Sequence, residues 1–234
     1  MKKLLLVSLI LVVFTTAYAQ REKVAMFKLR GGLTVPIDYF GKNRGKLDYS
    51  GFVKIGSNYG FEAVYFFSEN IGFGGLLSYN ILKVDNVRLT GAVINSNINY
   101  YTAFVKVNPF KTIVGTVGFY FDLPATDYFA FTMKMMIGTH IVQKPEGVIT
   151  VVDKTGLQFK LEETAIFESQ FAIYTGAGIR VNPYDNWNVT VDIEYVGSRF
   201  EFEYKKNGVP SISSSVVKNL VLSFGIAYFL EYKN

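Results

Sequence analysis

The chain has 234 residues, a formal net charge of +5, and a composition in which 50% of the residues are hydrophobic. It has no cysteine, which excludes a disulfide framework and cysteine-based metal sites. The small positive charge is spread along the chain and is not the profile of a nucleic-acid-binding protein. The length fits a single domain.

The first residues have the pattern of an export signal. Lys2 and Lys3 precede an apolar run over residues 4–14, and Ala17 to Ala19 form a small-residue cleavage pattern. An uncleaved anchor helix is the weaker alternative, because a bilayer core requires roughly 20 apolar residues. We therefore predict a signal peptide over residues 1–19 and a mature domain over residues 20–234, with a formal charge of +3.

Beyond residue 20, apolar and polar residues alternate with the two-residue period of β-strands. Phe27, Leu29 and Leu33, for example, alternate with Lys28 and Arg30. No later apolar stretch is long enough for a membrane-spanning helix. The pattern predicts eight strands, at about residues 25–35, 58–67, 71–80, 113–121, 129–138, 165–181, 187–195 and 220–232.

The connections between these strands alternate between long and short. The short ones cover residues 68–70, 122–127 and 182–186, and the long ones cover residues 38–57, 81–112, 142–164 and 205–215. Short periplasmic turns and long extracellular loops are typical of an even-stranded transmembrane barrel. A soluble β-sandwich or lipocalin-like barrel is the alternative, but the predicted outward faces carry almost no charge and an export signal precedes them.

Two features refine the long connections. Asn108 and Pro109 have the composition of a further short turn, but a periplasmic turn there would place the 122–127 turn and the carboxyl terminus outside. We therefore predict that residues 81–112 form one long, partly ordered loop. Residues 153–156 and 206–208 have the composition of hairpin tips, which predicts that some strands continue above the membrane.

On these residues the chain resembles the small outer-membrane β-barrel family of Gram-negative bacteria, with its porin-like and OmpA-, OmpX- and OmpW-like members. The resemblance is carried by the hairpin GFEAVYFFSENIGFGGLLSY at residues 60–79 and by the closing strand LVLSFGIAYFLEY at residues 220–232. It implies an all-β, eight-stranded antiparallel barrel in the cell outer membrane, surrounded by outer-membrane lipid.

In the closing strand, the resemblance assigns Ser223, Gly225, Tyr228 and Leu230 to the signal that the barrel assembly machinery recognises. Residues 231–234 follow this signal, whereas many family members end at an aromatic residue.

The predicted inward faces carry four cations and four anions. These residues are Lys28, Arg30, Glu62, Lys134, Glu168, Arg180, Asp192 and Glu194. The interior of an eight-stranded barrel is just wide enough for side chains to fill it, and an unpaired charge there is costly. The balance predicts a salt-bridged plug; a narrow polar conduit is the alternative.

No catalytic, metal-binding or cofactor-binding motif is recognisable. The single histidine, His140, lies on the inward phase, where some lipid-modifying barrels keep a histidine-based site, but Val142 occupies the position at which a serine would support that comparison. One histidine and scattered carboxylates do not predict a metal site. Gly176 and Gly178 fit close strand packing better than phosphate binding, because no helix pattern follows them.

The loops leave partner binding open. Lys42, Arg44 and Lys46 have the charge to contact lipopolysaccharide phosphates or to be solvated only, and the nearby aromatics Tyr39 and Phe40 suit a partner or the membrane interface. We expect a monomeric barrel with a structural, envelope-interaction or adhesion role, no enzymatic activity and no nucleic-acid partner. The alternatives are a narrow porin-like channel for small or hydrophobic solutes and, more remotely, a lipid-modifying enzyme.

Overall fold

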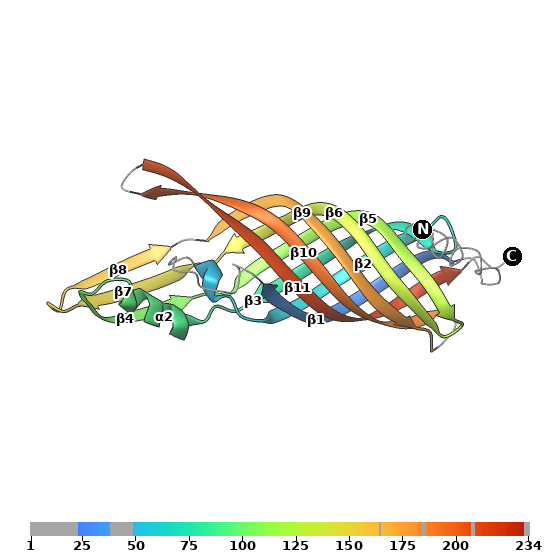
Figure 1. Cartoon of the computed structure of the whole chain (residues 1–234), viewed down its shortest axis with the longest axis horizontal. Coiled ribbons are helices and arrows are strands. Elements are labelled where there is room, and N and C mark those ends of the chain that lie inside the picture. Colours follow the sequence, from blue (N-terminus) through green and yellow to red (C-terminus); the bar gives the residue numbers. More distant parts are fainter. Residues whose placement is uncertain (1–22, 38–48, 164, 184–185, 207–208, 232–234) are drawn as a thin grey trace, which may run out of the picture.

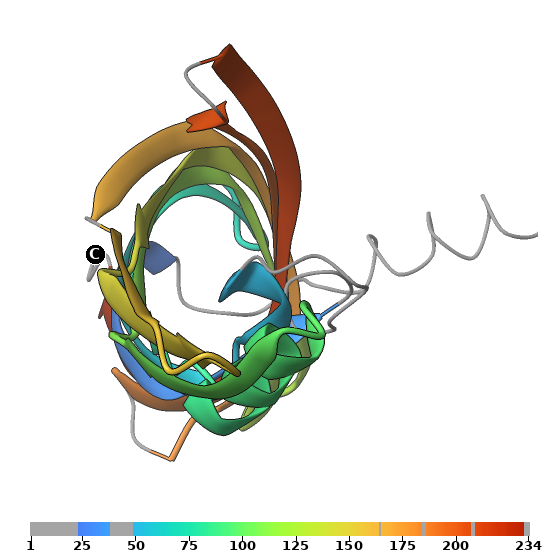
Figure 2. The same ribbon diagram turned by 90° about the vertical axis from the view of Figure 1, so that its left-hand side faces the viewer.

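Eight antiparallel strands close into a barrel in the order β1-β11-β10-β9-β6-β5-β3-β2 (Figures 1 and 2). The computed structural model describes residues 23–37, 49–163, 165–183, 186–206 and 209–231. The barrel strands are β1 (Lys23–Ile37), β2 (Gly56–Phe66), β3 (Ile71–Leu82), β5 (Phe110–Thr126), β6 (Phe129–Lys144), β9 (Ile166–Val181), β10 (Trp187–Lys206) and β11 (Val209–Glu231). The predicted eight-stranded all-β barrel is confirmed. The proposed signal peptide lies outside the described residues.

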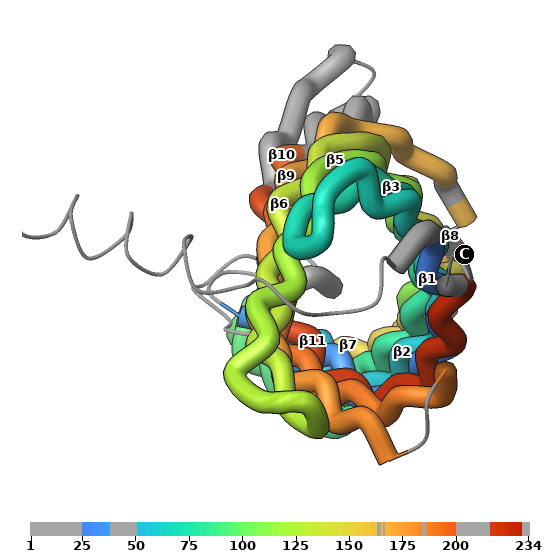
Figure 3. Tube along the Cα trace, turned by 90° about the vertical axis from the view of Figure 1, so that its right-hand side faces the viewer, coloured from blue at the N-terminus to red at the C-terminus, as the bar shows by residue number. Residues whose placement is uncertain are grey.

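A second, three-stranded sheet stands on the barrel wall at the end with the long connections (Figure 1). Its strands β4 (Tyr100–Val107), β7 (Gly147–Asp153) and β8 (Gln158–Glu163) pair in the order β4-β7-β8. They lead directly into or out of β5, β6 and β9, so the sheet continues that part of the wall outwards. At the opposite end, short turns join β2 to β3, β5 to β6 and β9 to β10 (Figure 3).

This extracellular sheet corrects the prediction that residues 81–112 and 142–164 are loops. A helix, α2 (Asn86–Asn95), and a short 3-10 helix, η2 (Tyr49–Phe52), accompany it. Leu89 and Val93 of α2 pack in one apolar cluster with Ala103 and Val151 of the sheet. Residues 100–107 form a strand that leads into β5, so the Asn108–Pro109 turn lies on the extracellular side, as inferred from the sequence.

Strands that continue beyond the barrel lead to both predicted hairpin tips. Asp153 begins the β7–β8 turn, where its carboxylate accepts hydrogen bonds from the backbone N–H groups of Thr155 and Leu157 at 2.8 and 2.9 Å. Gly156 follows with φ of 86°, a left-handed conformation that favours glycine. In the other hairpin, β10 and β11 stay paired as far as Lys206 and Val209.

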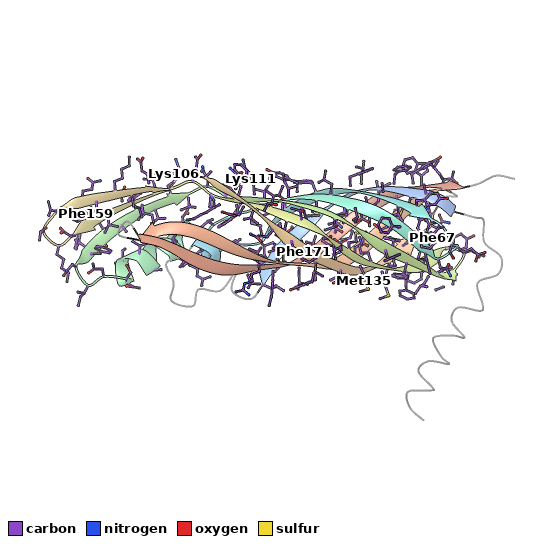
Figure 4. The ribbon with its side chains drawn as sticks, turned by 90° about the horizontal axis from the view of Figure 1, so that it is seen from above. Phe67, Lys106, Lys111, Met135, Phe159 and Phe171 are labelled. Atoms are coloured by element: carbon purple, nitrogen blue, oxygen red, sulfur yellow. The ribbon has the colours of Figure 1, made fainter. Side chains whose placement is uncertain are left out.

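The outer surface of the barrel is apolar. Leu29 and Ile193, for example, are 68% and 62% exposed, and Figure 4 labels Phe67, Met135 and Phe171 among the outward side chains. Such a continuous apolar surface is unfavourable in water and is typical of strands that face lipid. No helix in the described part of the chain is long and apolar enough to cross a membrane.

Aromatic pairs lie near the short-turn end of this apolar outer surface, here called the belt. Trp187 and Tyr228 pack with ring centroids 5.0 Å apart, and Phe73 and Phe119 with centroids 5.7 Å apart. Both pairs bridge neighbouring strands. Rings at this level are typical of the aromatic girdle of an outer-membrane barrel.

The belt predicts a position-dependent cost for charge. Leu222 faces outward near the middle of the belt, between Leu33 of β1 and Ile193 of β10. We expect Leu222→Arg to lower the free energy of unfolding by about 2–4 kcal/mol in a refolding titration, because the guanidinium would lie in hydrocarbon. Val87→Arg on α2, where Val87 is 83% exposed, is the control and should be nearly silent. Equal losses would show that this face does not contact lipid.

Candidate functional site in the barrel lumen

The middle of the barrel lumen holds three cations and three anions. These residues are Lys28, Arg30, Glu62, Lys134, Asp192 and Glu194, here called the lumen cluster. Their side chains are fully buried, because the alternation of four strands turns them all inward. The equal numbers make the cluster neutral.

Glu62 is the anion that all three cations of the cluster contact. Its carboxylate oxygens lie 3.0 Å from Lys28 Nζ, 2.9 Å from Arg30 Nη1 and 2.7 Å from Lys134 Nζ. Glu62 is on β2, whereas the cations come from β1 and β6. The contacts with Lys28 and Arg30 join neighbouring strands, whereas the contact with Lys134 crosses the lumen, because β3 and β5 separate β2 from β6.

The two carboxylates of β10 complete the cluster. Asp192 lies 3.0 Å from Lys28 Nζ, and Glu194 lies 2.6 Å from Lys134 Nζ and also pairs with Arg30. Each cation therefore contacts at least two carboxylates. Such close, charge-assisted contacts compensate for the loss of water around buried ions.

An amide and hydroxyl layer lies on the extracellular side of the lumen cluster. Arg30 Nη2 donates to Asn58 Oδ1 at 3.3 Å, and Asn58 Nδ2 donates to Asn80 Oδ1 at 2.6 Å. Asn80 Nδ2 donates in turn to Thr112 Oγ1 at 3.0 Å. This chain of hydrogen bonds extends the filled lumen from β1 to β5.

A separate ion pair lies on the periplasmic side. Arg180 donates from Nε and Nη2 to the two carboxylate oxygens of Asp122 at 3.1 and 3.0 Å, and from Nη1 to Asn188 Oδ1 at 2.6 Å. The guanidinium also lies over the Phe229 ring, 5.0 Å from its centroid. A bidentate contact of this kind fixes both side chains in one geometry.

The structure thus places seven of the eight predicted lumen charges in two groups and leaves one apart. Glu168 lies opposite Val142 near the outer end of β9, where its side chain is half-buried and outside the lumen cluster. Asp122, in place of Glu168, supplies the fourth negative charge inside the barrel. Sequence analysis missed Asp122 because Pro124 suggested a turn, whereas β5 continues through Pro124 to Thr126 and keeps Asp122 on the inward phase.

Inward-facing glycines make room for the long charged side chains. A Cβ atom at Gly176 would lie 2.8 Å from Cγ of Glu194, and one at Gly225 would lie 3.0 Å from Cδ of Lys28. The first distance is shorter than real Cβ contacts, and the second is tighter than most of them. The predicted role of Gly176 in close packing therefore has a specific cause, which is the space taken by the lumen cluster.

His140 faces inward and is fully buried, and its Nδ1 shares a hydrogen bond with Ser198 Oγ of β10 at 2.7 Å. A serine therefore does contact His140, but it comes from β10 and not from position 142. A buried histidine–serine hydrogen bond is also an ordinary structural contact, so it does not by itself indicate catalysis. Within the described residues, no group of three or more histidine, aspartate or glutamate side chains is placed to hold a metal ion.

A cavity lies where two barrel strands part. Pairing between β9 and β10 ends at Ala172 and Ser198, although both strands continue outwards. A cavity of about 600 Å³ follows, with Phe171, Ile173 and Tyr195 among its lining residues. This opening is the main interruption of the barrel ladder in the described residues.

The proposed assembly signal lies on β11 and spans both of its faces. Ser223 and Gly225 face the lumen, whereas Tyr228 and Leu230 face outward. Its role in assembly stays a prediction. The basic residues Lys42, Arg44 and Lys46, with Tyr39 and Phe40, lie outside the described residues.

Comparison with known proteins agrees with this architecture. The model of the outer membrane protein beta-barrel domain family matches residues 5–228. The chain therefore belongs to this family of Gram-negative outer-membrane barrels, and its location is the cell outer membrane. None of the curated proteins is a match.

Several solved outer-membrane proteins have a similar fold. Neisserial surface protein A is 12% identical, covers 88% of this chain and 97% of its own, and gives a TM-score of 0.48. OprG of Pseudomonas aeruginosa is 12% identical, with coverages of 90% and 99% and a TM-score of 0.47. Ail of Yersinia pestis is 15% identical, with coverages of 88% and 99% and a TM-score of 0.42.

The contacts of Glu62 predict a strong energetic coupling inside the lumen. Glu62→Ala should lower the free energy of unfolding by about 3–5 kcal/mol, because it leaves buried cations without a partner. In a double-mutant cycle, Lys28→Ala with Glu62→Ala should cost less than the sum of the single changes. The pair Lys54–Asp85, at 2.9 Å with Lys54 57% exposed, is the control, and its coupling should stay below about 1 kcal/mol. Coupling in the lumen as small as in this control would mean that the cluster is solvated.

The tight fit at Gly176 predicts a second effect. Gly176→Ala should destabilise the barrel by about 1–3 kcal/mol, because the added methyl group meets Glu194 in a packed interior. Gly115→Ala is the matched control, since a Cβ there has no heavy atom within 4 Å. Thermal unfolding in the same lipid measures both, and equal melting temperatures for the two variants would contradict a close-packed lumen.

Proposed function

We propose that this protein is a non-conducting, non-enzymatic outer-membrane barrel that anchors and presents a folded extracellular sheet, with a role in envelope interaction or adhesion. The observation that carries this proposal is the lumen cluster. Its six fully buried, mutually paired side chains occupy the middle of the lumen. A continuous water path would have to break these contacts.

Apolar layers on both sides of the polar layers support the same conclusion. On the periplasmic side, Phe66 packs against Tyr120 and Phe229 with ring centroids 6.0 Å apart in each pair. On the extracellular side, Phe52, Leu82 and other buried residues form the apolar cluster that includes α2 and the sheet. The lumen is therefore filled over most of its length, which suits an anchor better than a pore.

The extracellular unit is held in a fixed position. Asp85 caps α2 by accepting a hydrogen bond from the backbone N–H of Arg88 at 3.1 Å, and it pairs with Lys54. Burial alone would raise the pKa of Asp85, but the hydrogen bonds from Lys54 and Arg88 together lower that pKa below its usual value. A negative charge at a helix N-terminus is stabilising. A rigid, exposed sheet is a suitable recognition surface.

The partners that we propose follow from the surfaces. Outer-membrane lipid surrounds the apolar belt, and the barrel assembly machinery recognises the closing strand during insertion. Lipopolysaccharide is a further partner suggested by the basic residues of the first loop. The barrel acts in the membrane as a monomer.

A channel for small hydrophobic solutes is the second candidate. It is favoured by one observation, the cavity of about 600 Å³ where β9 and β10 part. The exposed residues Phe171 and Ile173 line this cavity, and none of its lining residues belongs to the lumen cluster. A solute route through it would leave the ion pairs intact.

Two measurements on the refolded protein test the proposal. Single-channel recordings in planar bilayers should show no stable open events, whereas Glu62→Ala should produce a leak because it opens the cluster. Vesicles loaded with an apolar fluorescent solute should retain it equally with and without the protein. Stable conductance of the unaltered protein would contradict the filled anchor, and faster release of the apolar solute alone would favour the second candidate.

A further inference from the structure

The β8 strand is an open edge of the extracellular sheet. One side of β8 pairs with β7 from Val152 and Gln158 to Gly147 and Glu163, and no strand in the described residues pairs with its other side. Figures 1 and 2 show the outer part of the β10–β11 hairpin diverging from this sheet. An open edge presents unpaired backbone N–H and C=O groups, to which another strand can add.

The inner face of the sheet is also incompletely covered at this edge. Phe159 and Leu161 of β8 remain 55% and 56% exposed. They line a pocket of about 340 Å³ together with Leu89 and Val93 of α2. The helix thus covers the part of the face formed by β4 and β7, and it leaves the apolar residues of β8 without a neighbour on the open side among the described residues.

The outer face of β8 carries one charge of each sign. Lys160 and Glu162 are exposed, and their charged atoms lie 2.5 Å apart along the same strand. Lys160, Leu161 and Glu162 therefore form a pattern that is complementary to itself. If a second β8 lies antiparallel with Leu161 opposite Leu161, each Lys160 lies opposite a Glu162, and each Phe159 lies opposite Glu163 and diagonal to Leu161 of the other copy.

Other registers of the same two strands are unfavourable. A shift by one residue turns the apolar residues of one copy to the charged face of the other. A shift by two residues places Lys160 opposite Lys160 or Glu162 opposite Glu162, and like charges opposite each other are destabilising. The opposite edge of the sheet, at β4, lacks such a pattern, and its Val107 N–H already donates to Asn86 Oδ1 at 3.3 Å.

We propose that β8 binds the β8 strand of a second copy of this chain located in a facing membrane. An antiparallel pair with matching faces has its two-fold axis perpendicular to the sheet. The sheet extends in line with the long axis of the barrel (Figure 1), so this axis places the second barrel at the far end, pointing the opposite way. Two barrels in one membrane point the same way and cannot form this pair. This inference rests on the proposed function of presenting an extracellular sheet. It specifies that function as adhesion between copies of the same protein.

One such contact is small, since β8 has six residues. Adhesion between membranes uses many copies at once, and multivalency raises the overall strength well above that of one contact. The side chains that must meet, Lys160, Glu162, Phe159 and Leu161, already lie at the free edge. No rearrangement of the barrel is required.

Clustering of vesicles that carry the refolded protein tests this inference. Phosphatidylcholine vesicles with the unaltered protein should cluster, as measured by light scattering. Lys160→Glu and Glu162→Lys, each alone, should reduce the initial clustering rate at least about tenfold, because each sets like charges opposite each other in every contact. When vesicles carrying Lys160→Glu are mixed with vesicles carrying Glu162→Lys, mixed clusters should form, because the two altered strands are complementary.

Lys106→Glu on β4 is the matched control for charge and should leave clustering unchanged. Folding of each variant is checked on denaturing gels, where a folded barrel migrates differently before and after heating. Failure of the unaltered protein to cluster vesicles would overturn the homophilic contact, while silent single-channel recordings would leave the filled anchor intact. Loss in the single variants without recovery in the mixture would overturn the proposed register. Undiminished clustering of both single variants would show that β8 is not the contact.

Discussion

An ionised side chain inside an eight-stranded barrel has almost no water around it, so it must find an opposite charge within the lumen. Glu62 meets this requirement for Lys28, Arg30 and Lys134 together, and Asp192 and Glu194 neutralise the remaining charge. The partners come from strands far apart in the sequence, so the cluster can form only when the barrel is closed. Closure of the ladder and neutralisation of the lumen therefore depend on each other.

The filled lumen also explains how the extracellular part is supported. The wall strands β5, β6 and β9 connect directly to β4, β7 and β8, and the apolar cluster of α2 and the sheet reaches buried Val142 and Val217 of the barrel strands. Movement of the sheet would disturb this packing, which makes the sheet a fixed surface above the membrane. The region where β9 and β10 part is the exception, because there the wall loses its ladder and a cavity takes its place. A barrel with a rigid lumen and one opening in its wall, between β9 and β10, is suited to presenting the strand edges of its extracellular part.

Much of this structure could be predicted from residue alternation. The two-residue period identified all eight barrel strands and the inward phase of Lys28, Glu62 and Asp192, because a lipid-facing apolar residue between two lumen residues leaves a regular pattern. It could not assign partners, since register and strand order bring together residues more than 160 positions apart, such as Lys28 and Asp192. Asp122 was missed because the proline two residues later resembles a turn. The tip between β7 and β8 was predicted, but β4, and the pairing of the three strands into one sheet, were missed because these strands are short and lie in connections that are usually loops. The crowding at Gly176 depends on the neighbouring Glu194 side chain, which has no signal in the local sequence.

Proton exchange at the lysine ammonium groups tests the central claim most directly. In protein refolded into lipid nanodiscs, nitrogen-detected NMR can follow exchange of the Lys28 and Lys134 ammonium protons with water, with the exposed Lys154 of the β7–β8 turn as the internal reference. A paired, water-excluding lumen cluster predicts that both buried ammonium groups exchange far more slowly than Lys154, and that Glu62→Ala accelerates both. Exchange of Lys28 and Lys134 as fast as that of Lys154 in the unaltered protein would show a hydrated lumen and would contradict the account.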